Sequence, residues 1–366
     1  MRRVRCLSLK PIVALSVGIF IAGGSPSFAQ TPASAAQATT AAPAPTSNPK
    51  YVAAMAEAKK LDRERQYIFA MDAYKKANKI AGGKDRESLK ELFDLQMKVG
   101  SFKDAIGTAS ALESIAATPL AKSVAETDRG RAIYAEMGDK NKPEKMQAAD
   151  AAFKAALADY PKNPTALYMD GTVLARMHQM DAASQQFKQC LSCMSPGDPG
   201  YVRAQHFAEN PELSAAKMAP PFTVVALDGT KFNLDEMGGR VVLIDFWATW
   251  CGPCNAELPY MKKIAKEFAG QPLVIISVSW DSDERKWKDF INKNEMTWVQ
   301  YRDADHELSK RFDVNAIPHY FTIDADGVLT SEILGSGSDV EGKLKKLVTK
   351  AKASGAKSVQ PVTATK

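Results

Sequence analysis

The chain has 366 residues, which is long enough for two or more domains that each bury a core. Its composition, 45% hydrophobic and 25% charged, is that of an ordinary soluble globular protein. The net charge of +6 comes mostly from four basic residues in the first ten positions, since removing them from the 48 basic residues leaves 44 against 42 acidic ones. No basic surface is implied, so nucleic acid is excluded as an expected partner.

Residues 1–29 have the pattern of a secretory signal peptide. The basic stretch MRRVRCLSLK precedes the apolar run PIVALSVGIFIAGG, and SPSFAQ offers a small-residue cleavage site after Ala29. The apolar run has about 14 residues, fewer than the ~20 that a membrane-spanning helix needs. We therefore expect a periplasmic protein whose signal is cleaved near Ala29. An uncleaved membrane anchor is the alternative.

Residues 30–49 are rich in Ala, Thr and Pro and nearly uncharged, which predicts a flexible linker. Residues 50–215 carry a helical pattern, and part of it repeats. The set Ala149, Phe153, Ala156 and Pro161 recurs 34 residues later as Ala183, Phe187, Cys190 and Ser195. This spacing resembles the tetratricopeptide repeat, in which paired helices use small residues at close contacts with an aromatic side chain between them. We predict an α-helical, tetratricopeptide-like repeat domain, with an irregular helical bundle as the alternative.

The pattern changes to strands and helices in residues 216–352. A hairpin is expected to turn at Asp228-Gly229, and the apolar run 240–248 predicts a central strand buried on both faces. A helix from about Cys254 to Phe268 follows. Further on, the sequence predicts a strand at 273–280, a helix at 281–294, a strand at 298–303, a helix at 306–312, a hairpin at 319–335 and a helix from about 339 to 351. Residues 353–366 are expected to be a disordered tail.

Cys251 and Cys254 flank Gly252-Pro253 at the point where the buried strand is expected to lead into a helix. Pro253 suits the first helical turn, where its missing N–H is not needed. Cys251 then lies beside the unpaired N–H groups of the helix N-terminus, which stabilise a thiolate and lower the thiol pKa. We therefore expect Cys251 to be the nucleophile toward a partner disulfide. Cys254, one turn further on, would resolve the mixed disulfide.

The stretch LIDFWATWCGPC (243–254) resembles the active-site strand and turn of the thioredoxin fold. CGPCNAELP (251–259) adds the CxxCxxExP signature typical of exported thioredoxin-like disulfide reductases of the TlpA/ResA type. The resemblance covers about residues 217–352. It implies an α/β thioredoxin fold for the C-terminal domain and thiol–disulfide exchange at the cysteine pair.

Three further residues match this family. Asp245 matches the buried acid of thioredoxins, and a carboxylate in a dry strand has a raised pKa and can exchange protons with Cys254. Pro318, in NAIPHY, matches the family's cis-proline, which packs against the cysteine pair. Glu257 matches the signature acid, where it would tune the site. The alternative for Glu257 is a favourable charge in the first helical turn.

By the same resemblance, substrate contacts are expected from residues around the cysteine pair and the cis-proline: Trp250, Gly252, Pro253, Ile317, Pro318 and His319. The backbone of Ile317 would pair with an extended substrate strand. His319 departs from many relatives, which have Thr after the cis-proline. It would either titrate near neutral pH and modulate the Cys251 thiolate or be a half-buried strand residue, and we favour the second interpretation.

Other chemistries fit the cysteine pair poorly. Structural zinc needs two more ligands, and His319 alone does not complete a site. Covalent haem needs Cys-x-x-Cys-His, but Asn255 follows the first pair and Met194 follows a second one, Cys190-Leu-Ser-Cys193. A peroxiredoxin would have a Pro/Thr setting before its cysteine, which ATWC lacks. We expect neither a metal nor a cofactor.

The second pair occupies a different setting. Cys190 stands at the small-residue position of the last helical repeat, where Ala156 stands in the preceding one. Cys193 lies one turn further on the same helix face, at a spacing that permits a disulfide only with strain. We predict structural thiols or a local disulfide. A redox relay with Cys251 is the alternative.

The sequence as a whole predicts a periplasmic thiol–disulfide oxidoreductase that reduces disulfides of exported proteins. The family implies re-reduction by a membrane-embedded dithiol donor and substrates such as apocytochrome c. Two alternatives remain open at this point: a helical-repeat scaffold that binds a protein partner and carries an accessory redox domain, or a thiol peroxidase.

Overall fold

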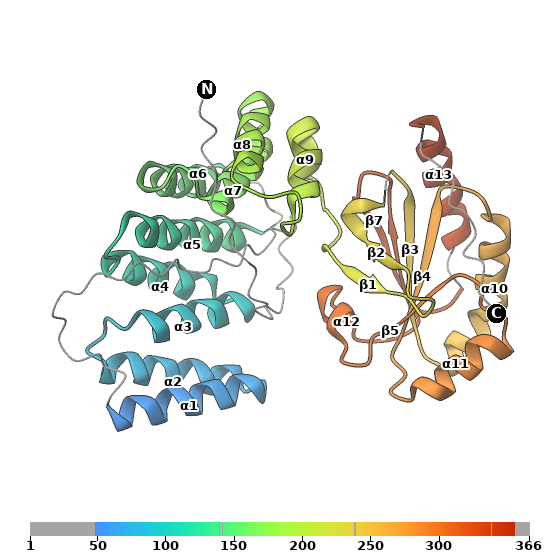
Figure 1. The fold of residues 1–366 in the computed structure, drawn as a ribbon, viewed down its shortest axis with the longest axis horizontal. Helices are drawn as coiled ribbons and strands as arrows, with labels where there is room; N and C mark the ends of the chain where they lie inside the picture. Colours follow the sequence, from blue (N-terminus) through green and yellow to red (C-terminus); the bar gives the residue numbers. More distant parts are fainter. Residues whose placement is uncertain (1–47, 139, 141, 238, 338, 356–366) are drawn as a thin grey trace. The chain divides into compact units, whose positions relative to one another are not determined.

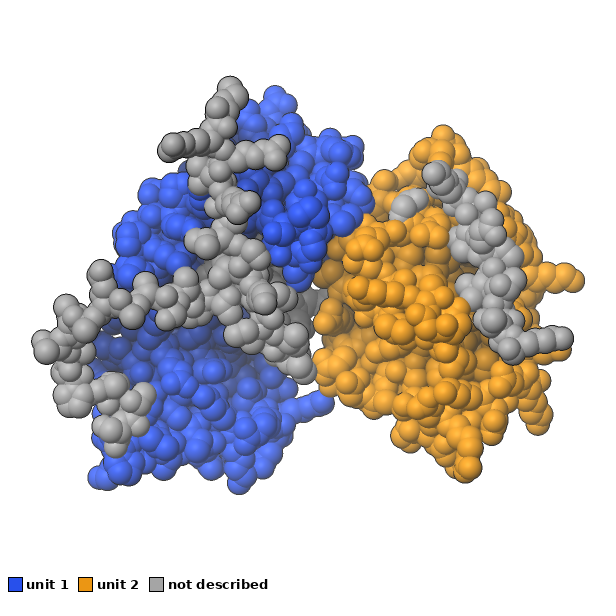
Figure 2. All heavy atoms as spheres, in the orientation of Figure 1, with its two compact units in different colours: residues 1–21, 25–215 blue, residues 22–24, 216–366 orange. Residues whose placement is uncertain are grey.

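The computed structural model describes residues 48–355, apart from residues 139, 141, 238 and 338. The predicted signal peptide (1–29), nearly all of the predicted linker and most of the predicted tail lie outside the described residues. The described chain forms two compact units, one ending at Ala215 and the other beginning at Ala216 (Figure 2). No helix in the described ranges is both long enough and apolar enough to span a bilayer.

The first unit is built from consecutive helices, each packed against the next along the chain (Figure 1). They are α1 (Pro49–Arg63), α2 (Tyr67–Ile80), α3 (Arg86–Lys98), α4 (Phe102–Ser114), α5 (Pro119–Met137), α6 (Pro143–Asp159), α7 (Pro164–Arg176), α8 (Met180–Ser192) and α9 (Tyr201–Glu209). Helices α1, α5 and α7 begin with proline directly after Asn48, Thr118 and Asn163, whose side chains accept a backbone N–H of the first turn. Because α1 begins at Pro49, the last residue assigned to the linker belongs to this helix and Asn48 caps it.

The repeated residues form the contacts inside the last helix pairs. Phe153 on α6 and Phe187 on α8 are fully buried. Each ring faces a glycine of the preceding helix: a Cβ on Gly130 would lie 2.6 Å from Phe153, and one on Gly171 would lie 2.9 Å from Phe187. The two helices of each pair can approach closely because the glycine leaves room for the ring. The predicted helical class of this unit is confirmed.

The second unit contains a five-stranded sheet in the order β5-β4-β3-β6-β7. Its strands are β3 (Val241–Trp247), β4 (Leu273–Ser279), β5 (Val299–Arg302), β6 (His319–Ile323) and β7 (Leu329–Leu334). Strand β3 pairs in parallel with β4 and antiparallel with β6. A separate hairpin of β1 (Thr223–Val225) and β2 (Lys231–Asn233) turns at the predicted Asp228-Gly229, where Gly229 has a φ of 84°.

Helices cover both faces of this sheet (Figure 1). Along β3, Val241 and Leu243 pack with α10 (Gly252–Glu267) and α13 (Val340–Ala353), while the alternate residues pack with the hairpin and α12 (Glu307–Arg311) on the other face. A smaller cluster joins the end of β3 and the cysteine pair to α11 (Glu284–Lys293). Both faces of β3 are buried, which explains its continuous apolar sequence. The predicted α/β thioredoxin-like class is confirmed.

Candidate active site

The cysteine pair lies where β3 leads into α10. Cys251 is the N-cap residue of α10, and Pro253 is in the first helical turn. The backbone N–H of Cys254 donates to Sγ of Cys251 across 3.2 Å. The two cysteines are joined by a disulfide bond, and each side chain is buried. In the reduced protein, a negative charge on Cys251 would therefore face an N–H group at the positive end of the helix dipole.

The surroundings of Cys251 combine exposed neighbours in the sequence with a backbone carbonyl group from a distant segment. Trp250 is 64% exposed, and Gly252 and Pro253 are exposed as well. On the other side, the carbonyl oxygen of Ile317 lies 3.9 Å from Sγ of Cys251. The peptide bond between Ile317 and Pro318 is cis. The residues predicted at the end of the strand, at the start of the helix and at the cis-proline thus lie close together around the sulfur atom of Cys251.

Asp245 lies on the α10 face of β3, directly beside Ser277 of β4 and Tyr320 of β6. Its side chain is buried, and Ser277 Oγ donates to its Oδ2 across 2.9 Å. Burial raises the pKa of Asp245 to about 7, the charge of Glu257 raises it as well, and the Ser277 hydrogen bond opposes them. A proton acceptor with this pKa can both take and release a proton near neutral pH.

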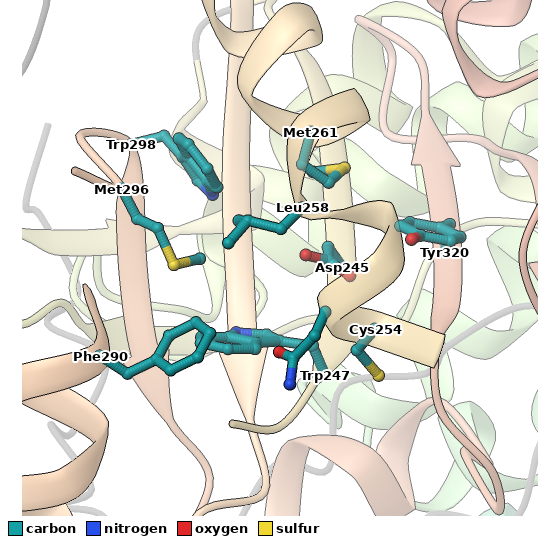
Figure 3. Close-up of a pocket in the computed structure, with 10 residues that line it drawn as sticks. Asp245, Trp247, Cys254, Leu258, Met261, Phe290, Met296, Trp298 and Tyr320 are labelled. Carbon is teal, nitrogen blue, oxygen red and sulfur yellow. The ribbon is translucent and has the colours of Figure 1, made fainter. Parts of the chain in front are cut away.

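A small cavity connects this carboxyl group with Cys254 (Figure 3). Asp245 and Cys254 both line it, together with apolar side chains from α10, α11 and the segment before β5. It has about 10 Å³ of room for the centre of a water molecule, which is about one water. One water molecule therefore fits in the space that Asp245 and Cys254 share.

Glu257 lies in the second turn of α10, because the helix begins at Gly252, two residues earlier than the sequence indicated. The interpretation of Glu257 as a first-turn charge is therefore wrong. Its Oε1 accepts the N–H of Gly337 across 3.2 Å. Its charge acts on Asp245 and Tyr320, raising the pKa of each. This placement favours a role for Glu257 in tuning the pKa of Asp245.

His319 is a core side chain of β6. It is only 5% exposed, its ring stacks on Phe321 at 4.6 Å, and its Nε2 lies 3.1 Å from Oε1 of Glu332. Burial lowers its pKa, while Glu332 opposes that shift. The favoured interpretation, a half-buried strand residue, gives the right element but underestimates the burial, and the role of His319 as a substrate contact stays a prediction.

The second cysteine pair is not joined by a disulfide in the structure. Of the two predicted possibilities, structural thiols fit this arrangement and a local bridge does not. Cys190 points into the contact between α8 and α7, where its Sγ lies 3.3 Å from the carbonyl oxygen of Pro164. Cys193 is the C-cap of α8 and is partly exposed. One side chain thus points inward and the other stands at the helix end. Burial raises the pKa of Cys190 to about 12.

Sequence reasoning missed the polar residues that support the site. Asp281 accepts the backbone N–H and the hydroxyl of Thr249, which fixes the loop before Cys251. Ser277 bonds Asp245, and the indole N–H of Trp298 bonds Ser277. The available signal was the serine in the middle of the strand LVIISVS, which the register places opposite the only acid of the neighbouring strand β3. Within the described ranges, no group of three His, Cys, Asp or Glu side chains could hold a metal ion.

Comparison with known proteins agrees with this geometry. Residues 214–350 match the family model described as Redoxin. Over 164 residues, the chain is 30% identical to thiol-disulfide oxidoreductase ResA of Bacillus thuringiensis (strain Al Hakam), covering 44% of this chain and 95% of that protein. The chain belongs to the ResA family of thiol-disulfide oxidoreductases. The Redoxin match begins at residue 214, so nearly all of the helical unit lies outside it.

Other relatives carry related names. The chain is 30% identical over 136 residues to thioredoxin-like protein YneN of Bacillus subtilis (strain 168), covering 36% of this chain and 79% of that protein. A solved structure, the thioredoxin domain of a thiol-disulfide oxidoreductase from Bacteroides vulgatus, is 29% identical and has a TM-score of 0.33, with 36% of this chain and 96% of that chain covered. As a ResA-family protein, this chain is an enzyme of thiol–disulfide exchange.

Proposed function

We propose that this oxidoreductase is exported to the periplasm and reduces disulfide bonds of other exported proteins. The observation that carries the proposed chemistry is Cys251 at the N-cap of α10, with the Cys254 N–H 3.2 Å from its sulfur. Buried Asp245 and the cis-proline segment complete the site. The signal-like pattern of residues 1–29 supports export.

The first step is attack by the Cys251 thiolate on one sulfur of the substrate disulfide. A bond forms between that sulfur and Cys251, the substrate S–S bond breaks, and the second substrate sulfur leaves as a thiolate that takes a proton from solvent. The N–H groups at the start of α10 stabilise the Cys251 thiolate before attack, since they face its sulfur.

The second step uses Cys254. Its thiol gives its proton to the Asp245 carboxylate, directly or through one water in the shared cavity, and the resulting thiolate attacks Cys251. The Cys251–Cys254 disulfide forms, and the remaining substrate sulfur leaves and is protonated. Two electrons have then passed from the enzyme dithiol to the substrate, which leaves as two thiols. The oxidised product is the disulfide form of the structure.

The substrate segment would bind as an extended strand beside Ile317. The Ile317 carbonyl lies 3.9 Å from Sγ of Cys251, so a strand paired with this backbone places its own sulfur next to the nucleophile. Exposed Trp250 offers apolar contact on the other side of the cysteine. Backbone pairing of this kind favours many unfolded or extended sequences over one folded partner.

The Gly-Pro dipeptide between the cysteines is that of thioredoxin, which lies at the reducing end of the potential range. An oxidising compartment would then require a membrane dithiol protein to reduce the Cys251–Cys254 disulfide after each turnover. Apocytochrome c and other exported proteins with disulfides are the proposed substrates.

The helical unit is proposed to be a tetratricopeptide-like array that recruits a protein partner. The supporting observation is the repeated contact of a helix glycine with an aromatic ring, Gly130 with Phe153 and Gly171 with Phe187. Such arrays present extended surfaces for partner binding. Pull-down by residues 48–215 alone, without the redox unit, tests this role.

Stoichiometric exchange with a disulfide peptide tests the direction of the reaction. Reduced protein mixed with oxidised peptide should transfer its electrons nearly completely, and oxidised protein should oxidise reduced peptide poorly. All five tryptophans lie between residues 247 and 298, so their fluorescence reports the change. Complete oxidation of the peptide would contradict the proposed direction, and peroxide consumption that survives Cys254→Ala would indicate a peroxidase. For location, the full chain expressed in a Gram-negative host should yield a periplasmic protein that begins at Gln30.

A further inference from the structure

A buried hydrogen-bond chain leads from an indole ring to the proposed proton acceptor. Trp298 Nε1 donates to Ser277 Oγ across 2.8 Å, and Ser277 Oγ donates to Asp245 Oδ2 across 2.9 Å. Ser277 is fully buried and stands directly opposite Asp245 in the register of β3 and β4. Trp298 lines the same cavity as Asp245 and Cys254 (Figure 3).

The chemistry of the three groups fixes the direction of this chain. An indole N–H can only donate, whereas a serine hydroxyl has one proton to donate and two lone pairs that accept. When Trp298 occupies a lone pair of Ser277, the hydroxyl proton remains available for the carboxylate. Trp298 therefore holds the hydroxyl in the orientation that stabilises the charged form of Asp245.

The remaining groups around Asp245 favour the neutral carboxyl. Cys254 and Glu257 face it from α10 and Tyr320 from β6, and the Glu257 charge opposes a second negative charge. Helix α13 contributes apolar side chains such as Leu344 to this face of the sheet. Ser277 is the neighbour that opposes them through a donated hydrogen bond.

We infer that Ser277 and Trp298 are positioning residues that keep Asp245 able to accept the Cys254 proton at neutral pH. This inference rests on the proposed role of Asp245 in the second step of exchange. It predicts that the two residues act on the pH dependence of the reaction through Asp245, without contact with the substrate.

The protein contains a second series of indole–serine–carboxylate hydrogen bonds, which ends at a different carboxylate. Trp280 Nε1 donates to Ser309 Oγ across 2.6 Å, and Ser309 Oγ donates to Asp303 Oδ2 across 2.6 Å. Asp303 also accepts the backbone N–H groups of Leu308 and Ser309 at the start of α12. This second carboxylate does not line the cavity with Cys254. Trp280→Phe therefore removes an equivalent indole–serine hydrogen bond away from the proposed proton path.

The test is the pH profile of single-turnover peptide reduction by the full chain between roughly pH 5 and pH 9, for Ser277→Ala, Trp298→Phe and Trp280→Phe. A hydrogen bond to a charged group is worth enough to move a pKa by roughly one unit. Ser277→Ala should raise the profile midpoint by about one unit, and Trp298→Phe should raise it by about half a unit. Trp280→Phe should leave the midpoint unchanged.

Two results would overturn the inference: profiles of Ser277→Ala and Trp298→Phe that superimpose on the wild type, or an equal shift in Trp280→Phe. Thermal unfolding of each variant, followed by circular dichroism, identifies any variant that does not fold. If either Ser277→Ala or Trp298→Phe does not fold, the pH profile of the other tests the inference. Asp245→Asn separates this inference from the proposed mechanism. If Asp245→Asn removes the pH step but Ser277→Ala does not move it, the positioning role fails alone. If Asp245→Asn has no effect on the step, the proton role of Asp245 fails.

Discussion

Two Cys-x-x-Cys pairs in one chain share their spacing and differ in almost everything else. Cys251 caps the beginning of a helix and accepts the N–H of Cys254, whereas Cys193 caps the end of a helix, where backbone carbonyl groups are unpaired. The first pair is bonded and the second is not. Burial against α7 raises the pKa of Cys190 to about 12, so that thiol does not ionise near neutral pH.

The spacing of two cysteines alone does not make a redox pair. A thiolate needs donors, and the start of a helix supplies them while its end supplies acceptors. The cysteine must also be next to a surface that can bind the partner disulfide, and the surface proposed for this role beside Cys251 includes Trp250 and Ile317. Cys190 instead fills a helix contact at the position that Ala156 occupies in the preceding repeat.

Removing one thiol from each pair should give the largest difference in activity between two variants. Cys251→Ser should reduce insulin disulfide reduction by dithiothreitol to the rate without enzyme, because no thiolate remains to attack. Cys190→Ala should keep the wild-type rate, since its thiol is buried in the helical unit. A large loss of activity in Cys190→Ala, in a protein that is still folded, would contradict the separation of the two pairs.

Asp245→Asn should slow the reaction at pH 8 on the order of 10²-fold, because Cys254 loses its proton acceptor. The wild-type rate should rise through about pH 7, where Asp245 ionises, and this step should vanish in the variant. The stability of the wild-type protein should fall over the pH range in which its rate rises. An acid whose pKa is raised in the folded state contributes stability below its unfolded pKa and loses it as pH rises through the folded one.

At pH 8 the free energy of unfolding of Asp245→Asn should therefore exceed that of the wild type by on the order of 2–4 kcal/mol. At pH 4 the two proteins should be equally stable. Urea titrations at the two pH values measure this difference. Equal stability at both pH values would show that Asp245 is not a buried acid of raised pKa.

A substitution in the helical unit should separate stability from activity. Gly171→Ala places a methyl group 2.9 Å from the Phe187 ring, and overpacking of this kind costs roughly 1–3 kcal/mol. Gly107→Ala lies in the open on α4 and should stabilise the same unit by roughly 0.5–1 kcal/mol. Far-UV circular dichroism during unfolding measures both, and the redox rate of the two folded variants should be that of the wild type.

Glu257→Gln should give the smallest effect. Gln still accepts the Gly337 N–H but removes the charge that raises the pKa of Asp245. The midpoint of the pH profile should fall by a few tenths of a unit, roughly what a charge near a partly screened site produces. Glu267→Gln, on the same helix but paired with Lys345 at the surface, is the control and should leave the midpoint in place.

Much of the redox unit followed from its sequence. The apolar run at 240–248 indicates a strand buried on both faces, and Gly229 and Gly327 indicate tight turns. The strand and the two hairpins therefore lie where they were predicted. His319 followed in part: the sequence favoured a half-buried strand residue, but its near-complete burial depends on the pairing of β6 with β3 and β7. Ser277 became visible only through register, since Asp245 and Ser277 lie 32 residues apart along the chain.

We expect Cys251 and Cys254 to form a reducing redox couple while Cys190 and Cys193 remain separate thiols. Alkylation with mass mapping, across a series of thiol buffers of known potential, reports both pairs in the same sample. One transition is expected, at Cys251–Cys254, near the ~−270 mV of thioredoxin, with Cys190 and Cys193 alkylated individually throughout. A transition near the ~−120 mV of strong oxidants, or a disulfide between Cys190 and Cys193, would contradict it.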